Sequence, residues 1–396
     1  MKARALHCKE KRSAGHRLDA AAPLQNAPPA PIALCRTPGP STMHLQFIIG
    51  TLRHLTIATA FLLAAPASAQ KTELRILTWV DYVDPEVTAE FGRQHNVEFK
   101  YFYFNSDSER DKLLTESDGK GFDVVTVNGS VVEHYRKLGW LAPLDPARMP
   151  DLKHASPRWR DGYPGTKQYA VPYMMGTLGL AFRRDLVPEG VDSWMDVFEP
   201  NKTLCGKIYM GGDSRELINV ALKAAGAKSS SLDPADYKRA EALLLKQKPC
   251  VAAYIYPTQD KSIMSDGRAA VAMAFSSDMA TLAESDSRVE YVVPKEGGGL
   301  WVDYIVAMAA SSNPELAMAF LNYTHKPQVH ARLAMFTGAM PTNPAAEKLL
   351  PAKVRANRTI FPDAQTLARS EEDKGSPAQI VKLRNNIFSK VVRRSR

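Results

Sequence analysis

Segments with the apolar pattern of β-strands alternate with segments that have the pattern of amphipathic helices along most of this chain. The first strands are expected at 74–77, 97–102 and 122–127, and the first helices at 85–91, 108–115 and 131–138. A βαβα order predicts parallel strands whose crossover helices cover both faces of a sheet. Two extended segments, at 169–173 and 178–182, then lead to a second block. Its strands are expected at 207–210, 251–256, 269–275, 289–293 and 301–308, and its helices at 214–225, 234–246, 259–266, 278–285 and 314–324. The predicted fold class is therefore α/β.

The junction between the first strand and the first helix carries Trp79, Asp81 and Tyr82 within four residues. The carboxyl ends of the strands form the edge of an open α/β sheet at which ligands bind. An indole face and a nearby carboxylate suit an alkylammonium group, because the ring attracts the cation and the carboxylate pairs with it. The alternative is that Trp79 and Tyr82 fill the sheet edge and Asp81 caps the following helix.

The first seventy residues do not have the pattern of a fold. Residues 1–42 are rich in Ala, Pro and Arg, without strand or helix periodicity. Met43 then opens a signal-peptide pattern, with an apolar run at 55–65 and the small-x-small motif at 67–69. We expect 1–42 to be an upstream over-extension of the reading frame and 43–69 to be a signal peptide cleaved near Ala69, which predicts a periplasmic protein. A genuine long leader or an organelle transit peptide is the alternative.

The net charge of +9 belongs largely to this leader. Residues 1–70 contain eight Lys and Arg against two Asp and Glu, which leaves 43 against 40, or +3, for the rest of the chain. A charge so close to zero gives no support to nucleic-acid binding. The apolar run is too short to span a bilayer permanently, and no later segment is long and apolar enough to do so.

About 327 residues follow the expected cleavage site, a length that favours two domains. Two of the four cysteines, Cys205 and Cys250, remain after cleavage. In an exported protein such a pair is a candidate disulfide, and each cysteine precedes an expected strand, so the two could be neighbours. Two separate buried thiols are the alternative.

Enzyme and metal signatures are scarce. The sequence has no Gly-x-Ser-x-Gly elbow, P-loop, Cys-x-x-Cys or His-Glu-x-x-His motif. The histidines after the leader are scattered, and the spacing of His325 and His330 is poor for two metal ligands on one helix face. No cofactor or metal is expected.

Acidic residues, with or without an aromatic neighbour, recur just beyond the expected strands. Asp213 and Glu216 follow the strand at 207–210, and Asp278 follows the strand that ends at Phe275. Helix first turns favour such acids on electrostatic grounds alone. Trp301 and Asp303 lie two residues apart in an expected strand, so their side chains share one face. A carboxylate in this apolar strand needs a partner, which a cationic ligand would supply.

From residue 74 to about 362 the sequence resembles the periplasmic spermidine/putrescine-binding proteins of ABC importers. The matching pieces are LTWVDY at 77–82, GFDVV at 121–125, VPYM at 171–174, DSRE at 213–216, VPKEG at 293–297 and WVD at 301–303. PTNP at 341–344 with AAEKLL at 345–350 continues the match. Each piece is weak, but their order and spacing together are specific.

This resemblance implies a two-lobed periplasmic-binding-protein fold, in which each lobe is a mainly parallel sheet flanked by helices and the ligand lies in the interlobe cleft. Lobe 1 would comprise 71–176 and about 302–347, and lobe 2 about 177–301 and 348–396. By position, Trp79 and Trp301 would sandwich the methylene chain, and Tyr82, Asn128 and Ser130 would line the wall of lobe 1. The carboxylates that receive the amines would come from Asp81, Asp213, Glu216, Asp278 and Asp303.

Three departures put the particular amine in doubt. Phe275 stands where these proteins usually have Trp, Ser130 replaces the Tyr of spermidine-type members, and an aromatic residue common near 338–341 is missing. The resemblance implies a monomeric, non-enzymatic protein that binds a polyamine and delivers it to an ABC permease in the inner membrane. The alternatives are a binding protein for a related amine or guanidino compound, a polyamine sensor for a signalling partner, and an enzyme on the same fold.

Overall fold

The computed structural model describes residues 71–393. The expected over-extension at 1–42 and the expected signal peptide at 43–69 therefore lie outside the described residues. The strands are β1 (Thr72–Thr78), β2 (Val97–Tyr103), β3 (Val124–Asn128), β4 (Val171–Arg183), β5 (Ile208–Met210), β6 (Val251–Tyr254), β7 (Val271–Phe275), β8 (Val289–Val292), β9 (Gly299–Ala307), β10 (Met340–Pro341) and β11 (Glu371–Glu372).

Helices follow most of these strands. The α-helices are α1 (Pro85–His95), α2 (Asp107–Glu116), α3 (Val132–Lys137), α4 (Pro157–Arg160), α5 (Thr166–Tyr169), α6 (Met195–Phe198), α7 (Ser214–Ala224), α8 (Pro234–Gln247), α9 (Ser262–Ser265), α10 (Ser276–Ser285), α11 (Pro314–Thr324), α12 (Pro327–Thr337), α13 (Pro344–Glu347), α14 (Ala352–Arg355), α15 (Ala364–Arg369) and α16 (Ala378–Val392). None of the helices between residues 71 and 393 has the length and apolar character needed to cross a membrane.

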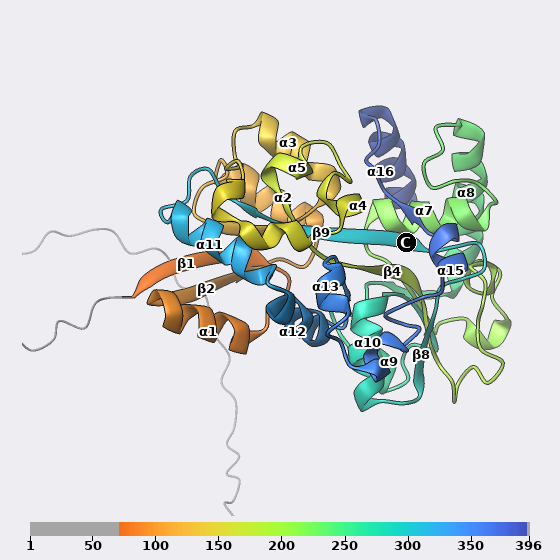
Figure 1. The fold of residues 1–396 in the computed structure, drawn as a ribbon. Helices are drawn as coiled ribbons and strands as arrows, with labels where there is room; N and C mark the ends of the chain where they lie inside the picture. The colour runs from red at the N-terminus through yellow and green to blue at the C-terminus, as the bar shows by residue number, and fades with distance from the viewer. Residues whose placement is uncertain (1–70, 394–396) are drawn as a thin grey trace, which may run out of the picture. The chain divides into compact units, whose positions relative to one another are not determined.

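One sheet connects the strands in the order β2-β1-β3-β9-β4-β7-β5-β6. The strands β2, β1 and β3 are parallel to one another, and so are β7, β5 and β6. The two long strands β9 and β4 join these sets and pair with them, and with each other, in antiparallel fashion. Figure 1 shows both strands crossing between the helices α1, α2 and α11 and the helices α7, α8 and α16. We call β2-β1-β3 the first half of the sheet and β7-β5-β6 the second half.

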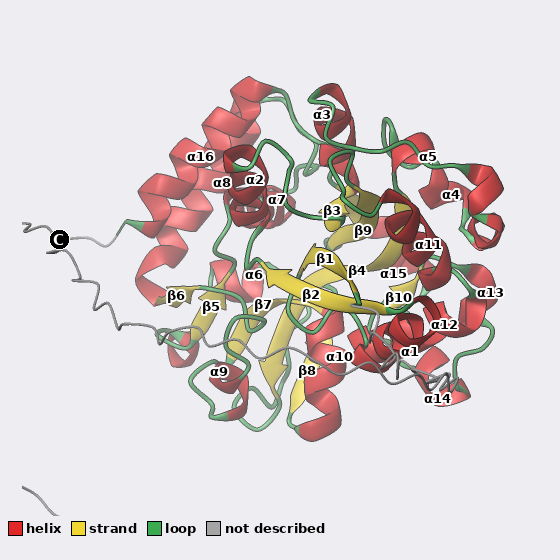
Figure 2. Cartoon of the chain, turned by 90° about the vertical axis from the view of Figure 1, so that its left-hand side faces the viewer, coloured by secondary structure: helices red, strands yellow, loops and turns green. Residues whose placement is uncertain are grey.

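Each half buries apolar side chains against helices. In the first half, Phe91 of α1 and Leu321 of α11 belong to one buried cluster, and Tyr135 of α3 belongs to another. In the second half, Leu217 of α7 packs in a cluster that includes Ile387 of α16. Figure 2 shows helices on both sides of the strands. These layers are those expected when crossover helices cover a sheet on both faces.

Most of the expected elements are present, with two clear differences. The two extended segments expected at 169–173 and 178–182 are one continuous strand, β4, which is buried along its whole length. The sequence suggested two pieces because Pro172, Gly176 and Gly179 interrupt its apolar pattern. The helix expected at 259–266 is wrong in length, since α9 spans four residues. The Asp260 carboxylate accepts a hydrogen bond from the Ser262 amide at 3.1 Å and so fixes a turn before α9.

Polar caps fix the helix starts that border the later site. Asp84, rather than Asp81, caps α1 and accepts a hydrogen bond from the Glu86 amide. Ser106 caps α2 and Asp213 caps α7 in the same way. Such caps satisfy amides that have no partner within the helix. They also set the positions of the first-turn side chains.

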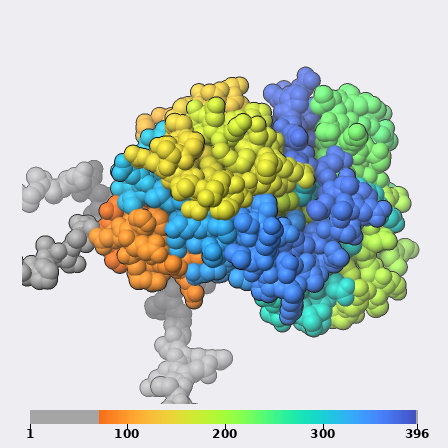
Figure 3. Space-filling view, viewed as in Figure 1, coloured from red at the N-terminus to blue at the C-terminus, as the bar shows by residue number. Residues whose placement is uncertain are grey.

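The last part of the chain returns to the middle of the sheet. Strand β11 pairs in parallel with Gly299 and Leu300 of β9, and α16 then packs against α7. Figure 3 shows residues from this part, in blue, on the surface between the yellow and green regions. The segment around residue 371 therefore lies beside β9, although more than seventy residues separate the two in sequence.

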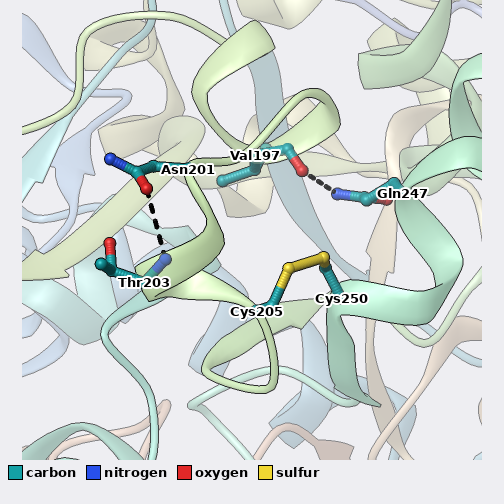
Figure 4. Close-up of a disulfide and its surroundings, with 6 residues drawn as sticks. All are labelled: Val197, Asn201, Thr203, Cys205, Gln247 and Cys250. Carbon is teal, nitrogen blue, oxygen red and sulfur yellow. Dashed lines mark hydrogen bonds between the residues drawn. A yellow bond between two sulfur atoms is a disulfide. The ribbon is translucent and has the colours of Figure 1, made fainter.

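A disulfide joins Cys205 and Cys250 in the second half (Figure 4). The Gly206 amide also donates a hydrogen bond to the Cys250 carbonyl at 2.8 Å. The bridge lies just before β5 and β6, which are neighbours in the sheet. It closes a loop across 45 residues, and such a cross-link stabilises a fold mainly by restricting the unfolded chain, in the usual entropic model.

Candidate functional site

One face of strand β9 forms the floor of the candidate site. Gly299, Trp301 and Asp303 are partly exposed and alternate with buried Leu300 and Val302. This alternation is that of a strand with one face against the core. The expectation that Trp301 and Asp303 share a face is confirmed.

The Trp301 indole depends on a glycine in the neighbouring strand. A β-carbon at Gly176 would lie 2.4 Å from Cζ2 of Trp301 and 2.7 Å from the Ser276 hydroxyl oxygen. A larger side chain at Gly176 would therefore push the indole away from the strand. Glycine at this position lets the ring lie across β4.

At one end of this face, the Asp303 carboxyl is held by a phenol from the first half. The Tyr82 hydroxyl donates a hydrogen bond to Oδ2 of Asp303 at 2.8 Å, and the Tyr173 hydroxyl donates to the Tyr82 carbonyl at 3.0 Å. Burial raises the pKa of Asp303 to about 7; the charge of Asp107 adds to this rise, and the bond from Tyr82 opposes it. The carboxyl is thus close to half ionised at neutral pH.

At the other end, the first turn of α7 brings Asp213 and Glu216 to the site. The Asp213 carboxylate accepts hydrogen bonds from the Glu216 amide at 2.8 Å and from the Tyr256 hydroxyl at 2.5 Å. Burial raises the pKa of the Glu216 carboxyl to about 7, against the lowering effect of the adjacent Arg215. The preference of helix first turns for acidic residues therefore does not fully explain Asp213 and Glu216. The Glu216 side chain points toward Gly299 of β9, and its Oε2 lies 3.5 Å from the position that a β-carbon would take there.

A cavity of about 450 Å³, including the part open to solvent, lies beside Glu216 and Trp301. Its lining includes five of the expected site residues: Asn128, Ser130, Glu216, Phe275 and Trp301. The ring of Phe275 stands nearly perpendicular to that of Trp301, at 87° and 6.4 Å between centroids. The two rings give the cavity two aromatic walls of different orientation.

Asn128 and Ser130 follow β3 and connect the cavity to α2. The Asn128 amide donates to Oδ2 of Asp107 at 2.9 Å, and its own oxygen accepts from the Ser130 amide at 3.1 Å. The charges of Arg110 and Arg215 lower the pKa of Asp107 to about 2, although burial alone would raise it. Asp107 is therefore a permanent anion behind the cavity wall.

The first junction lines a separate cavity. Trp79, Asp81 and Tyr82 border a second space of about 450 Å³ together with Tyr101, Tyr103 and Phe336. The Trp79 ring packs against Phe104, with centroids 4.3 Å apart. Tyr82 lines this second cavity and also bonds to Asp303. The structure thus assigns Trp79 and Trp301 to different cavities, and the sandwich of a methylene chain between them stays a prediction.

Four of the five expected acids are not among the residues that line the first cavity: Asp81, Asp213, Asp278 and Asp303. The Asp81 side chain is 73% exposed, and Oδ2 lies 4.0 Å from Nζ of Lys261. The Asp278 carboxylate accepts a hydrogen bond from the Thr258 hydroxyl, and burial raises its pKa. Asp278 is not among the lining residues of either cavity described above.

Several polar residues of the cavity were not predicted as ligand-binding residues. Arg215, Asn219, Glu371 and Asp373 line the cavity, and Asp107 bonds to two of its residues. Asp107 resembled an ordinary first-turn acid of a helix, and Arg215 an ordinary surface arginine. Glu371 and Asp373 belong to the returning segment near β11, and no local pattern shows that this segment reaches β9. The DSRE motif at 213–216 was the one signal that could have drawn attention to Arg215.

The described residues offer no site for a metal. Between residues 71 and 393, no group of three or more His, Cys, Asp and Glu side chains could hold a metal ion. His325 and His330 are both buried, and their ring centroids lie 4.8 Å apart. These two histidines are therefore not solvated at the surface. They pack inside the first half instead.

The residues and the fold match known binding proteins. The spermidine/putrescine-binding periplasmic protein of Escherichia coli (strain K12) is 28% identical over 336 residues, which cover 83% of this chain and 95% of that protein. The putrescine/agmatine-binding protein of Pseudomonas aeruginosa is 28% identical over 349 residues, with 83% and 94% covered.

A solved structure shares the architecture. The spermidine/putrescine ABC transporter substrate-binding protein of Streptococcus pneumoniae matches with a TM-score of 0.71 at 23% identity, covering 81% of this chain and 98% of that one. The two-lobed binding-protein fold expected from the sequence is thereby confirmed. A family model for bacterial extracellular solute-binding proteins matches residues 86–362. The chain belongs to this family of bacterial extracellular solute-binding proteins.

Proposed function

We propose that this protein captures a linear polyamine outside the cytoplasm and delivers it to an ABC permease. The names of its relatives support a polyamine ligand, and the family supports a binding rather than a catalytic role. One observation carries the proposal. Asp303 lies on β9 two residues from Trp301, and its described hydrogen-bond partner is a neutral phenol.

The raised pKa of Asp303 indicates that this carboxyl lacks a cationic partner in the described structure. Two guanidinium partners, Arg110 and Arg215, keep the pKa of the buried Asp107 carboxyl low. Asp303 instead has a pKa of about 7, because its charge is buried without such a partner. A ligand ammonium at this position would supply the missing charge through a charge-assisted hydrogen bond.

The aromatic walls suit the rest of a polyamine. The rings of Trp301 and Phe275 line the cavity beside Glu216, and Trp301 lies between Gly299 and Asp303 on one face of β9. Methylene groups lose contact with water against such rings, and an aromatic face also attracts a nearby cation. A strand face with Glu216 beside one end, Asp303 at the other and Trp301 between them is thus complementary to a chain with charged ends and an apolar spacer.

Binding would shift the protein toward a closed state that the permease recognises. In this proposal lobe 1 comprises 71–176 and about 302–347, and lobe 2 comprises about 177–301 and 348–396. A ligand that contacts both lobes, such as one held by Asp303 and Glu216, favours closure by its higher affinity for the closed state. Neither capture nor release makes or breaks a covalent bond.

Calorimetric titration of the purified protein tests the proposal. Protein stripped of bound ligand by partial unfolding and refolding is titrated with putrescine, cadaverine, spermidine, spermine and agmatine. Micromolar or tighter binding of at least one of them is expected. No binding of any of the five, by a protein whose melting curve is cooperative, would refute the polyamine assignment.

A further inference from the structure

The turn that carries Tyr82 has few restraints of its own. Residues 80–82 lie between β1 and α1 and belong to neither element. Asp81 has a φ of 54°, in the left-handed region that residues other than glycine seldom adopt. Among the described residues, 71–393, one hydrogen bond is recorded to the main chain of this turn: the Tyr173 hydroxyl donates to the Tyr82 carbonyl at 3.0 Å. Tyr173 therefore restrains the main chain from which the Tyr82 phenol extends.

Tyr173 lies at an irregular position of β4. The pairing of β4 with β9 is interrupted between Pro172 and Met175, and Tyr173 lies inside this interruption. Its carbonyl accepts a hydrogen bond from the Thr342 hydroxyl at 2.9 Å, and its side chain is buried. Such bulges often redirect a side chain next to a functional site. Here the redirected phenol reaches the Tyr82 carbonyl.

The two tyrosines form a chain of contacts that ends at Asp303. The Tyr82 hydroxyl donates to Oδ2 of Asp303 at 2.8 Å. The rings of Tyr82 and Tyr173 pack edge to face, with centroids 5.5 Å apart. Tyr82 lines the second cavity, whereas Tyr173 lines neither of the two cavities described above. The influence of Tyr173 on Asp303 therefore passes through Tyr82.

The bond from Tyr82 affects the charge of Asp303. A hydrogen bond to the ionised form of a carboxyl stabilises that form. Burial and the charge of Asp107 raise the pKa of Asp303, whereas the Tyr82 bond and the charges of Arg110 and Arg215 lower it. Displacement of the Tyr82 hydroxyl would therefore raise this pKa further, and a smaller fraction of the carboxyl would be ionised at neutral pH.

We propose that Tyr173 is a positioning residue for amine binding, whose hydroxyl holds Tyr82 against Asp303 and so keeps that carboxylate available to a ligand ammonium. The inference rests on the proposed function. It gives β4 a part in binding besides its place in the sheet. A tyrosine outside both cavities then controls the affinity for the amine and the pH range over which the amine binds.

The titration of Asp303 tests this inference without a ligand. The carboxyl carbon of Asp303 is followed by NMR in protein labelled at aspartate, and its signal is assigned by its loss in Asp303→Asn. In Tyr173→Phe, which removes the hydroxyl alone, the pKa of Asp303 is expected to rise by about one pH unit. The affinities for putrescine and spermidine at pH 7 are expected to fall about fivefold, because less of the carboxyl is ionised.

Two further variants separate positioning from a general loss of stability. Tyr82→Phe should raise the pKa of Asp303 at least as much, and Tyr173→Phe should add nothing in that background, because its effect passes through Tyr82. Tyr304→Phe is the matched control, since the Tyr304 hydroxyl is also buried and donates to a main-chain carbonyl, that of Trp159, at 2.7 Å. This control should lower the melting temperature but leave the pKa of Asp303 and both affinities unchanged.

The outcomes distinguish the role of Tyr173 from the proposed function. An unchanged pKa of Asp303 in Tyr173→Phe, or an equal rise in Tyr304→Phe, would overturn the role of Tyr173 and leave amine binding intact. If Tyr173→Phe does not fold, Thr342→Val, which removes the bond to the Tyr173 carbonyl, should raise the pKa of Asp303, and an unchanged pKa would overturn the inference. Failure of the wild-type protein to bind any of the five amines would instead refute the proposed function.

Discussion

The carboxyls beside the two ends of the β9 face are held in opposite ways. At the β9 end, Asp303 stands alone with the Tyr82 phenol, whereas at the α7 end Glu216 belongs to a network with Arg215 and Asp107. Both carboxyls have a pKa near 7, with burial as the main cause. Two buried carboxyls can therefore have similar pKa values whether or not a cationic side chain of the protein lies beside them. The two carboxyls differ in whether a cationic group of a ligand would be their first cationic partner.

The largest effect is expected from removing Arg110, the buried arginine that pairs with Asp107 near the α7 end. Arg110 is fully buried and bonds to Asp107 at 2.6 Å and to Asp111 at 2.7 Å. In Arg110→Met, the Asp107 charge loses one of its two guanidinium partners. Removing one member of a buried ion pair costs about 3–5 kcal/mol, so the free energy of unfolding should fall by about 3 kcal/mol or more.

Urea unfolding measures this loss, with Lys112→Ala as the control. Lys112 lies on the same helix, but its side chain is 72% exposed and 3.8 Å from Glu116. That variant should stay within about 0.5 kcal/mol of wild type. Equal stability of the two variants would show that the ionic network at the α7 end does not depend on Arg110.

The next prediction removes the isolated carboxyl. Asp303→Asn keeps an acceptor for Tyr82 but loses the negative charge, so polyamine affinity should fall at least about 100-fold, or about 3 kcal/mol. The same change should stabilise the ligand-free fold at pH 8. A carboxyl whose pKa is raised to about 7 in the fold binds more protons folded than unfolded between about pH 4 and 7. The stabilisation that proton binding to the Asp303 carboxyl gives the fold is therefore lost as the pH rises from about 4 to 7.

Paired melts and titrations at pH 8 distinguish these effects. The stabilisation is at most about 4 kcal/mol, and it should vanish below about pH 4, where the Asp303 carboxyl is protonated in both states. Asp192→Asn serves as the control, since Asp192 is 74% exposed and paired with Lys295 on the surface. An Asp303→Asn protein that binds polyamine like wild type would remove Asp303 from the site.

The pH dependence of binding sharpens the comparison further. An ammonium group requires an ionised carboxyl, so protonation of Asp303 and Glu216 competes with the ligand. With both pKa values at about 7, the dissociation constant should rise about tenfold per carboxyl between pH 8 and pH 6, or about 100-fold in total. In Glu216→Gln the rise should be about tenfold. A dissociation constant that does not change over this range would mean that neither carboxyl binds the amine in its ionised form.

Local patterns predicted the fold and the β9 end of the site. Strand and helix periodicity gave most elements, and the spacing of Trp301 and Asp303 placed them on one face. The α7 end needed contacts that no local pattern contains. Asp107 and Arg215 are more than one hundred residues apart in sequence, and their bond depends on how α2 and α7 meet across the sheet. The carboxylate of Asp373 arrives through the pairing of β11 with β9, a contact between distant segments.

The smallest effect is expected for the ion pair of Asp81 and Lys261, which we compare with the ion pair of Asp107 and Arg215. Asp81 and Lys261 lie 4.0 Å apart, with side chains 73% and 44% exposed, whereas Asp107 and Arg215 are 25% and 35% exposed and 2.7 Å apart. Solvent screens the first pair, so a double-mutant cycle of Asp81→Asn and Lys261→Gln should give a coupling free energy below about 0.5 kcal/mol. The cycle of Asp107→Asn and Arg215→Gln should exceed about 1 kcal/mol, because these groups are less hydrated and share a charge-assisted hydrogen bond. Urea unfolding without ligand measures both cycles. Equal couplings would mean that the lower exposure of Asp107 and Arg215 adds nothing to the strength of their ion pair.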